Sequence, residues 1–122
     1  MNDIRSQETL SVLYVEDEAM IRILFTSFLK RRFKDVYIAA NGKEGLDLFM
    51  AHRPDVVVTD IAMPLMNGFK MIELIKEVNP TQPIIITSGF NDDDNNSKNV
   101  YAFLVKPIIK DELIDLIIKS CS

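Results

Sequence analysis

Short apolar runs and segments with helical periodicity take turns along the chain. The runs are rich in β-branched and aromatic residues, and each has the length of a strand rather than of a helix. They cover Leu10–Val15, Val36–Ala39, Asp55–Thr59, Pro83–Thr87 and Val100–Val105. Three of them are almost continuous in apolar residues, which is typical of strands covered on both faces. The pattern therefore predicts a buried sheet.

The segments between these strands carry apolar residues at intervals of three and four, the spacing of one helical face. They include Met20–Leu29, Leu46–Met50, Met71–Val78 and Leu113–Ile117. Gly42 and Gly68 mark turns that lead into helices. Alternating strands and helices predict a parallel sheet with helices on both faces. For 122 residues this indicates an α/β protein with a flavodoxin-like, doubly wound, five-stranded parallel sheet in the order 2-1-3-4-5.

One stretch interrupts the alternation at the place where a fourth helix belongs. Asn91–Asn99 contains no apolar residue, and most of its residues are Asp or Asn. These residues are poor helix formers that favour caps and turns, because their side chains compete for backbone hydrogen bonds. We therefore expect the fourth helix to be short, frayed or disordered.

Composition limits the possible functions. With 48% apolar and 26% charged residues the chain is typical of a globular domain, which we expect to cover residues 10–120 after a polar lead of residues 1–9. A net charge of −4 argues against direct binding of nucleic acid, since phosphate contacts need clustered positive charge. No apolar run approaches the roughly 18 residues that span a bilayer. A single cysteine and the lack of an export signal favour a soluble, cytoplasmic protein without membrane contact.

Polar residues whose side chains can bind ligands or react follow the predicted strands. Glu16 and Asp17 follow the first strand, Asp60 the third, Ser88 the fourth and Lys106 the fifth. In open parallel sheets ligands bind beyond the carboxyl ends of the strands, where the winding reverses. The first and third strands are neighbours in the predicted order, so their carboxylates are expected to converge.

Three converging carboxylates repel one another unless a positive charge lies among them. Mg²⁺ is a suitable cation, because it prefers oxygen ligands and usually takes only one or two carboxylates together with phosphate oxygens. With the ammonium of Lys106 and the hydroxyl of Ser88, the group suits a transferring phosphoryl group, and Asp60 is the candidate nucleophile. Thr87 is an alternative hydroxyl, but alternation along the strand allows only one of the two to face the site. Counting from Pro83 favours Ser88.

The chain resembles the receiver domains of two-component response regulators. The stretches that carry the resemblance are Val12–Glu18, Val58–Gly68, Pro83–Gly89 and Phe103–Pro107. Each is a modest signal, but all four occur in the right order, each at the end of a predicted strand. The flanking helices extend the resemblance over nearly the whole chain.

The resemblance implies a role for each site residue. Asp60 would be the phosphoacceptor, and Asp17 and Asp60 would bind Mg²⁺. Glu16 would act through a metal-bound water, and the backbone carbonyl of Ala62 would supply a further ligand. Lys106 would pair with the acceptor or its phosphate. The switch residues would be Ser88, which would bond a phosphate oxygen, and Phe103, which would turn inward as Ser88 moves; the Lys106-Pro107 bond would be cis.

The implied function is that of a signalling domain. A sensor histidine kinase or a phosphotransfer protein would donate the phosphoryl group, and a downstream protein, with dimerisation possible, would read the change. Such a domain is not an enzyme beyond catalysing its own phosphorylation and dephosphorylation. The alternative is a degenerate receiver that acts as a constitutive interaction domain. A phosphatase or a flavodoxin is disfavoured, because Ala62 replaces the second acid of the former and Glu16–Glu18 would repel the phosphate of the latter.

The chain departs from the resemblance in two ways. From Ser88 to Lys106 it is about four residues shorter than usual, which is close to one helical turn. In addition, Ala62 and Phe90 are apolar at positions that tune the lifetime of the phosphoryl group. Without a polar group to orient water there, we expect slow self-dephosphorylation.

Overall fold

The computed structural model describes residues 9–89 and 100–121. Its sheet consists of β1 (Ser11–Val15), β2 (Asp35–Ala39), β3 (Val56–Thr59), β4 (Ile84–Ser88) and β5 (Ala102–Val105). All neighbouring strands are parallel, and the order is β2-β1-β3-β4-β5. The order predicted from the sequence is therefore confirmed.

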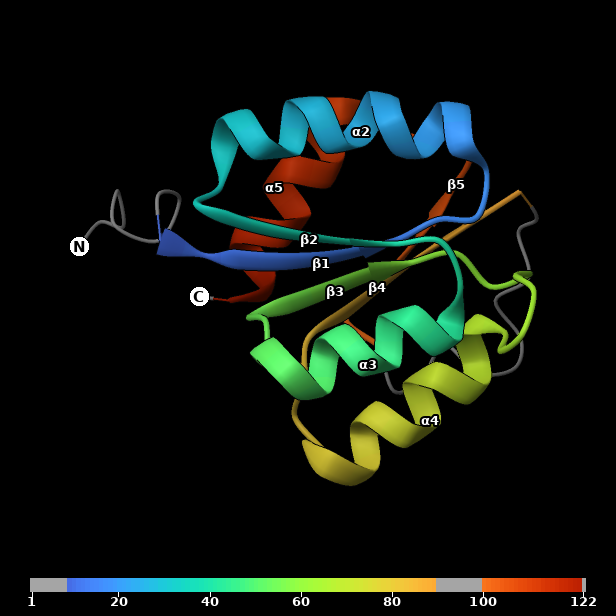
Figure 1. Ribbon diagram of the computed structural model, residues 1–122. Coiled ribbons are helices and arrows are strands. Elements are labelled where there is room, and N and C mark those ends of the chain that lie inside the picture. Colours follow the sequence, from blue (N-terminus) through green and yellow to red (C-terminus); the bar gives the residue numbers. More distant parts are fainter. Residues whose placement is uncertain (1–8, 90–99, 122) are drawn as a thin grey trace.

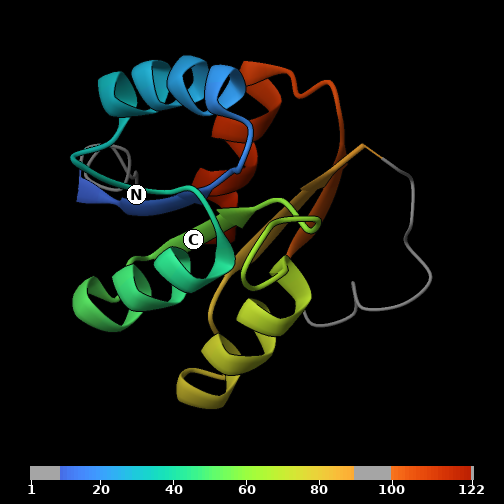
Figure 2. The same ribbon diagram turned by 45° about the vertical axis from the view of Figure 1, so that its right-hand side comes forward.

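Helices cover both faces of this sheet (Figure 1). In the described part of the chain these are α2 (Ala19–Arg32), α3 (Gly42–His52), α4 (Gly68–Val78) and α5 (Lys110–Ser120). In both views α2 and α5 lie on one side of the sheet, and α3 and α4 lie on the other (Figure 1 and Figure 2). This arrangement gives the three layers of a doubly wound fold, as predicted.

Alternation along the strands divides the core in two. Val12 and Tyr14 of β1 belong to the cluster beneath α2 and α5, whereas Leu13 and Val15 belong to the cluster beneath α3 and α4. In β3 and β4, as in β1, both sides are buried. Their almost continuous apolar sequence is therefore explained by helices on both faces.

The strand boundaries differ from the predicted ones by one or two residues. The largest difference is at β5, which begins at Ala102 rather than at Val100. The amide of Tyr101 still donates a hydrogen bond to the carbonyl of Ile84 at 2.7 Å, so the chain joins the sheet before the regular strand begins. The sequence also predicted a short, frayed or disordered fourth helix at Asn91–Asn99. This segment lies outside the described residues.

Asparagine caps start two of the helices. Asn41 Oδ1 accepts a hydrogen bond from the amide of Glu44 at 2.9 Å, and Glu44 Oε1 accepts one from the amide of Ala40 at 2.8 Å. Asn67 Oδ1 accepts one from the amide of Lys70 at 2.9 Å. Such caps satisfy amides that have no partner within the helix. The turns that Gly42 and Gly68 predicted thus lead directly into α3 and α4.

Gly68 is required by a close approach of the backbone. A Cβ atom at this position would lie 2.2 Å from the carbonyl oxygen of Asp60. The amide of Gly68 also donates a hydrogen bond to the carbonyl of Ile61 at 2.7 Å. The start of α4 is therefore held directly against the loop that follows β3.

Candidate functional site

Three carboxylates converge just beyond the carboxyl ends of β1 and β3. These strand ends point to the right in Figure 1. Glu16, Asp17 and Asp60 each offer one oxygen atom, and these atoms all lie within 4.8 Å of one another. The cause is the pairing of the two strands, which continues beyond their ends: the amide of Asp60 donates a hydrogen bond to the carbonyl of Val15 at 3.1 Å. The structure thus brings together the acids that the strand order predicted to meet.

The ammonium group of Lys106 bridges two of these acids. Its Nζ atom lies 3.1 Å from Glu16 Oε1 and 2.9 Å from Asp60 Oδ2. The end of β4 positions the backbone of Lys106, because the amide of Lys106 donates a hydrogen bond to the carbonyl of Ser88 at 2.7 Å. The Lys106-Pro107 peptide bond that follows is cis. Side chains from opposite parts of the sequence therefore form one charged cluster.

Burial and charge act against each other in this cluster. Burial raises the pKa of Glu16, which is only 1% exposed, and nearby Asp60 raises it further. Hydrogen bonds from the amide of Glu18 and from Lys106 offset only part of this rise. Burial alone would lower the pKa of Lys106, but its bonds to Asp60 and Glu16 outweigh burial and raise it. Lys106 consequently stays positively charged at neutral pH.

The three acids differ in how many partners they have. Asp60 Oδ1 accepts a hydrogen bond from the amide of Ile61 at 2.7 Å, and Glu16 Oε2 accepts one from the amide of Glu18 at 3.1 Å. Within the described residues, the carboxylate of Asp17 has neither a hydrogen-bond partner nor an ion-pair partner, and Asp17 is exposed. It is therefore the carboxylate most available to a ligand from solvent.

The cluster fits a hard divalent cation. Three carboxylates and one ammonium group leave a formal charge of −2 when all are ionised. Oxygen ligands close together on an open edge are the donor set that Mg²⁺ prefers. Asp17 and Asp60 would contribute carboxylate oxygens to such a cation. Glu18, which comes next in sequence, is not part of the cluster but lies at the N-cap position of α2 without a side-chain cap bond.

Ser88 and Thr87 end β4 on opposite faces of the sheet. Ser88 shares its face with Ile86 and, on β5, with Phe103, which is paired with Ile86. Thr87 lies on the other face, and its buried Oγ1 atom has no hydrogen-bond partner among the described residues. The two predicted switch residues, Ser88 and Phe103, therefore occupy one face. Ala62 lies exposed in the loop after β3.

One apolar surface on α2 differs from what the helical spacing indicated. Met20 and Leu24 follow the helical spacing of a buried stripe, yet they are 78% and 60% exposed, as is Ile23 at 67%. The described core residues of α2 are Phe25, Phe28 and Leu29. The residue that could have indicated an exposed apolar surface is Ile23, because it makes the first half of the helix apolar on more than one side. An apolar surface thus follows directly after the acidic loop, which consists of residues 16–18 between β1 and α2.

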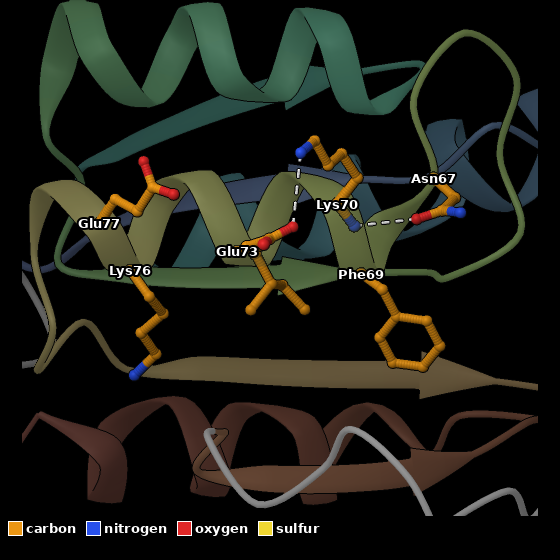
Figure 3. A pocket seen from close by; sticks show the side chains of 7 residues that line it. Asn67, Phe69, Lys70, Glu73, Lys76 and Glu77 are labelled. Carbon is orange, nitrogen blue, oxygen red and sulfur yellow. Dashed lines mark hydrogen bonds and ion pairs between the residues drawn. The ribbon is translucent and has the colours of Figure 1, made fainter.

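A separate surface cavity of about 620 Å³ runs along α4 (Figure 3). It is lined mainly by polar and charged side chains, including Lys70 and Glu73, which form an ion pair at 3.5 Å. None of the lining residues belongs to the acidic cluster. The cavity therefore adds no group to the candidate site.

Comparison with known proteins agrees with this geometry. The family model described as response regulator receiver domain matches residues 12–118. This chain belongs to that family. Receiver domains accept phosphoryl groups from histidine kinases, bind Mg²⁺ at an acidic cluster and interact with other proteins.

The relatives differ in how much of their length this chain covers. The chain is 31% identical over 114 residues to the chemotaxis protein CheY of Bacillus subtilis, covering 89% of this chain and 95% of that protein. It is 40% identical over 86 residues to a protein-glutamate methylesterase/protein-glutamine glutaminase of Nitrosospira multiformis, covering 68% of this chain but only 24% of that enzyme. The chain thus corresponds to only part of the latter.

Solved structures share the fold over almost the whole chain. The N-terminal domain of an uncharacterized protein from Wolinella succinogenes has a TM-score of 0.85 and 32% identity, covering 92% of this chain and 94% of that one. The response regulator TrrA from Thermotoga maritima, in complex with Mg²⁺-BeF, has a TM-score of 0.81 and 27% identity, covering 92% and 99%. No helix in residues 9–89 and 100–121 is both long and apolar enough to cross a membrane.

Proposed function

We propose that this chain accepts a phosphoryl group on the carboxylate of Asp60 from a phosphohistidine of a sensor histidine kinase or a phosphotransfer protein, and that phosphorylation alters its protein-binding surface. The observation that carries the proposal is the ion pair between Lys106 and Asp60 inside the cluster with Glu16 and Asp17. Asp60 is 9% exposed, so it is screened from bulk water but open to a donor at the edge of the sheet.

The transfer uses the groups of this chain as follows. An Asp60 carboxylate oxygen forms a bond to phosphorus while the bond between phosphorus and the donor imidazole nitrogen breaks. The electron pair of the broken bond stays on the imidazole, which takes a proton from solvent. A charged side chain held beside the reacting oxygens stabilises the charge on the phosphoryl group without reorganising during the step. Lys106 is positioned for this role by its bond to Asp60 at 2.9 Å.

In this proposal Mg²⁺ would be held by Asp17, Asp60 and the backbone carbonyl of Ala62, and Glu16 would act through a bound water. When bound, it supplies positive charge to the phosphoryl oxygens. Glu16 serves this chain in a second way, because its buried carboxylate accepts the bond from Lys106 at 3.1 Å and so orients that ammonium group. Ser88 would then bond a phosphate oxygen, and Phe103, on the same face, would turn inward.

The apolar surface beside the site suits a protein donor. Met20, Ile23 and Leu24 lie at the start of α2, directly after the acidic loop, and the 59% exposed Ile109 lies three residues after Lys106. Exposed apolar side chains next to a reacting group favour contact with a protein surface. We assign this surface to the phosphodonor. The downstream target, dimerisation and a cytoplasmic location remain part of the proposal and follow from the family's signalling role.

The test is the intact mass of the full chain after incubation with acetyl phosphate. The wild type with Mg²⁺ is expected to gain one phosphoryl group, and Asp60→Asn or wild type with a chelator is expected to gain none. Asp115→Asn, which removes a carboxylate 61% exposed on α5, serves as the matched control and is expected to behave as wild type. Labelling of Asp60→Asn equal to that of wild type would exclude Asp60 as the acceptor.

Two further outcomes separate the alternatives. A wild type that binds Mg²⁺ but gains no mass from acetyl phosphate would indicate strict dependence on a protein donor, and the same measurement with a phosphorylated histidine kinase would then decide. A wild type that neither binds Mg²⁺ nor gains mass would contradict the proposal and favour a constitutive interaction domain.

A further inference from the structure

Arg22 reaches back from α2 to the loop that carries two of the acids. Its Nη1 atom donates hydrogen bonds to the carbonyl oxygens of Glu16, at 2.9 Å, and of Asp17, at 3.3 Å. Its backbone amide donates to the carbonyl of Glu18 at 2.9 Å. A single arginine thus contacts the backbone of every residue in the acidic loop.

This loop has few other attachments near Asp17. Lys106 and the amide of Glu18 hold the side chain of Glu16. The backbone amide of Glu16 donates a hydrogen bond to the carbonyl of Ala39 at 3.0 Å. The side chain of Asp17 has no partner within the described residues, and α2 begins without a side-chain cap bond. The orientation of the Asp17 peptide therefore depends on the contact with Arg22.

We propose that Arg22 is a positioning residue for cation binding: its guanidinium group holds the backbone of Glu16 and Asp17, and thereby places the Asp17 carboxylate beside Asp60. The inference rests on the proposed function, since it assumes that the acidic cluster holds Mg²⁺. Arginine suits this task because its planar guanidinium group presents several donors in a fixed arrangement, whereas lysine presents a compact charge on a flexible stem.

The charge of Arg22 and its positioning role have opposite effects on affinity. A positive charge near the cluster repels a cation, so its removal by itself would strengthen cation binding. Loss of the two carbonyl contacts frees the Asp17 peptide and would weaken binding, because ligands that must be ordered on binding cost conformational entropy. The direction of the change in affinity therefore distinguishes positioning from simple electrostatics.

The experiment compares Arg22→Met, Arg22→Lys and the control Arg31→Met in the full chain. Arg31 is exposed in the last turn of the same helix, so Arg31→Met removes the same charge far along α2 from the acidic loop. Binding of Mn²⁺, used as a spectroscopic substitute for Mg²⁺, is followed by the loss of the free-ion EPR signal, and thermal unfolding is measured without metal. We expect Arg22→Met to bind Mn²⁺ about 5- to 10-fold more weakly than wild type. Arg31→Met is expected to match wild type.

Arg22→Lys provides the second readout. It keeps the charge but not the two-carbonyl contact, so its affinity for Mn²⁺ is expected to be no higher than that of Arg22→Met, because the repulsion of the cation remains. This variant remains informative if Arg22→Met does not fold. The acetyl phosphate reaction gives a third readout: the Mg²⁺ concentration for half-maximal rate should rise in Arg22→Met, while the rate at saturating Mg²⁺ should stay close to that of wild type.

Three results would overturn the inference. The first is Mn²⁺ binding by Arg22→Met that equals or exceeds that of wild type. The second is a lower melting temperature with unchanged affinity, which would show a structural role only. The third is a wild type that binds no Mn²⁺, which would contradict the proposed function as well; the first two leave the proposed function intact.

Discussion

The Nζ atom of Lys106 lies 2.9 Å from Asp60 Oδ2, although 46 residues separate the two in sequence. The same atom contacts Glu16, which is 90 residues away and almost completely buried. A buried pair that loses one partner leaves an uncompensated charge. The stability of this edge of the sheet and its chemistry therefore depend on the same ammonium group.

Removing the ammonium group should separate cation binding from phosphorylation. We expect Lys106→Met to bind Mg²⁺ about 3- to 10-fold more tightly, because a neighbouring positive charge is lost. We also expect its phosphorylation by acetyl phosphate at saturating Mg²⁺ to slow by roughly 100-fold, because charge stabilisation of the phosphoryl oxygens is lost. Calorimetric titration and the rate of mass gain measure the two effects. Lys119→Met, which breaks an exposed ion pair with Asp115, should change neither.

The raised pKa of Glu16 should appear in the pH dependence of stability. A carboxyl group with a higher pKa in the folded state binds protons more tightly when folded. Its contribution therefore favours folding at low pH and is lost as the pH rises from the ordinary Glu value of about 4.3 through the raised one. Relative to wild type, Glu16→Gln should gain stability as the pH rises through this window. Urea unfolding with a chelator, from acidic to neutral pH, measures the difference.

The control for this comparison is Glu112→Gln, which removes an exposed carboxyl group from the first turn of α5. Its stability difference from wild type should not rise with pH in the same window. If the free energies of unfolding of Glu16→Gln and wild type differ by the same amount at every pH, the prediction of a raised pKa for Glu16 is wrong.

Gly68 should tolerate no side chain. Alanine at this position would place its Cβ 2.2 Å from the Asp60 carbonyl oxygen and 2.9 Å from the Ile61 Cα, and neither backbone atom can move aside easily. We expect Gly68→Ala to lower the free energy of unfolding by about 1–3 kcal/mol, as measured by urea denaturation. Gly89→Ala is the matched control, because a Cβ there meets nothing within 4 Å. Equal stability of the two variants would contradict the close approach.

The phosphorylated chain should be long-lived. Ala62 is exposed two residues after Asp60, and it offers no polar side-chain group to orient an attacking water. We expect a hydrolysis half-life well above seconds, and a shorter half-life in Ala62→Gln than in wild type. The decay of the phosphorylated mass after removal of acetyl phosphate measures both. Leu65→Gln, an exposed substitution in the same loop, controls for added polarity, and a wild-type half-life of seconds would contradict the prediction.

The exposed apolar surface at the start of α2 should matter only for a protein donor. Ile23 is 67% exposed, so Ile23→Lys should fold normally and accept phosphate from acetyl phosphate at the wild-type rate. Transfer from a phosphorylated histidine kinase that serves the wild type should be slowed by about 10-fold, because an apolar contact becomes charged. Val78→Lys replaces a partly exposed apolar residue at the end of α4 and is the control. Equal transfer to both variants would place the donor elsewhere.

Much of the fold could be predicted because its causes are local. The nearly continuous apolar runs of β3 and β4 require cover on both faces, and the helical spacing between the strands supplies that cover. The convergence of the acids could be predicted because neighbouring parallel strands have their carboxyl ends at the same end of the sheet. The exposure of Met20 could not be predicted in this way, because periodicity shows which residues share a helical face but not how far the sheet extends beneath it.

The alternation of strands and helices and the residues at each strand end could be predicted without the structure, since they follow from backbone periods of 2 and 3.6 residues. The folded structure was needed to show that Lys106 contacts Glu16 as well as Asp60, that the Asp17 carboxylate is left without a partner in the described chain, and that Arg22 holds the acidic loop. These contacts depend on side-chain reach and on the exact approach of separate elements. Both are set by packing of the whole domain rather than by local spacing.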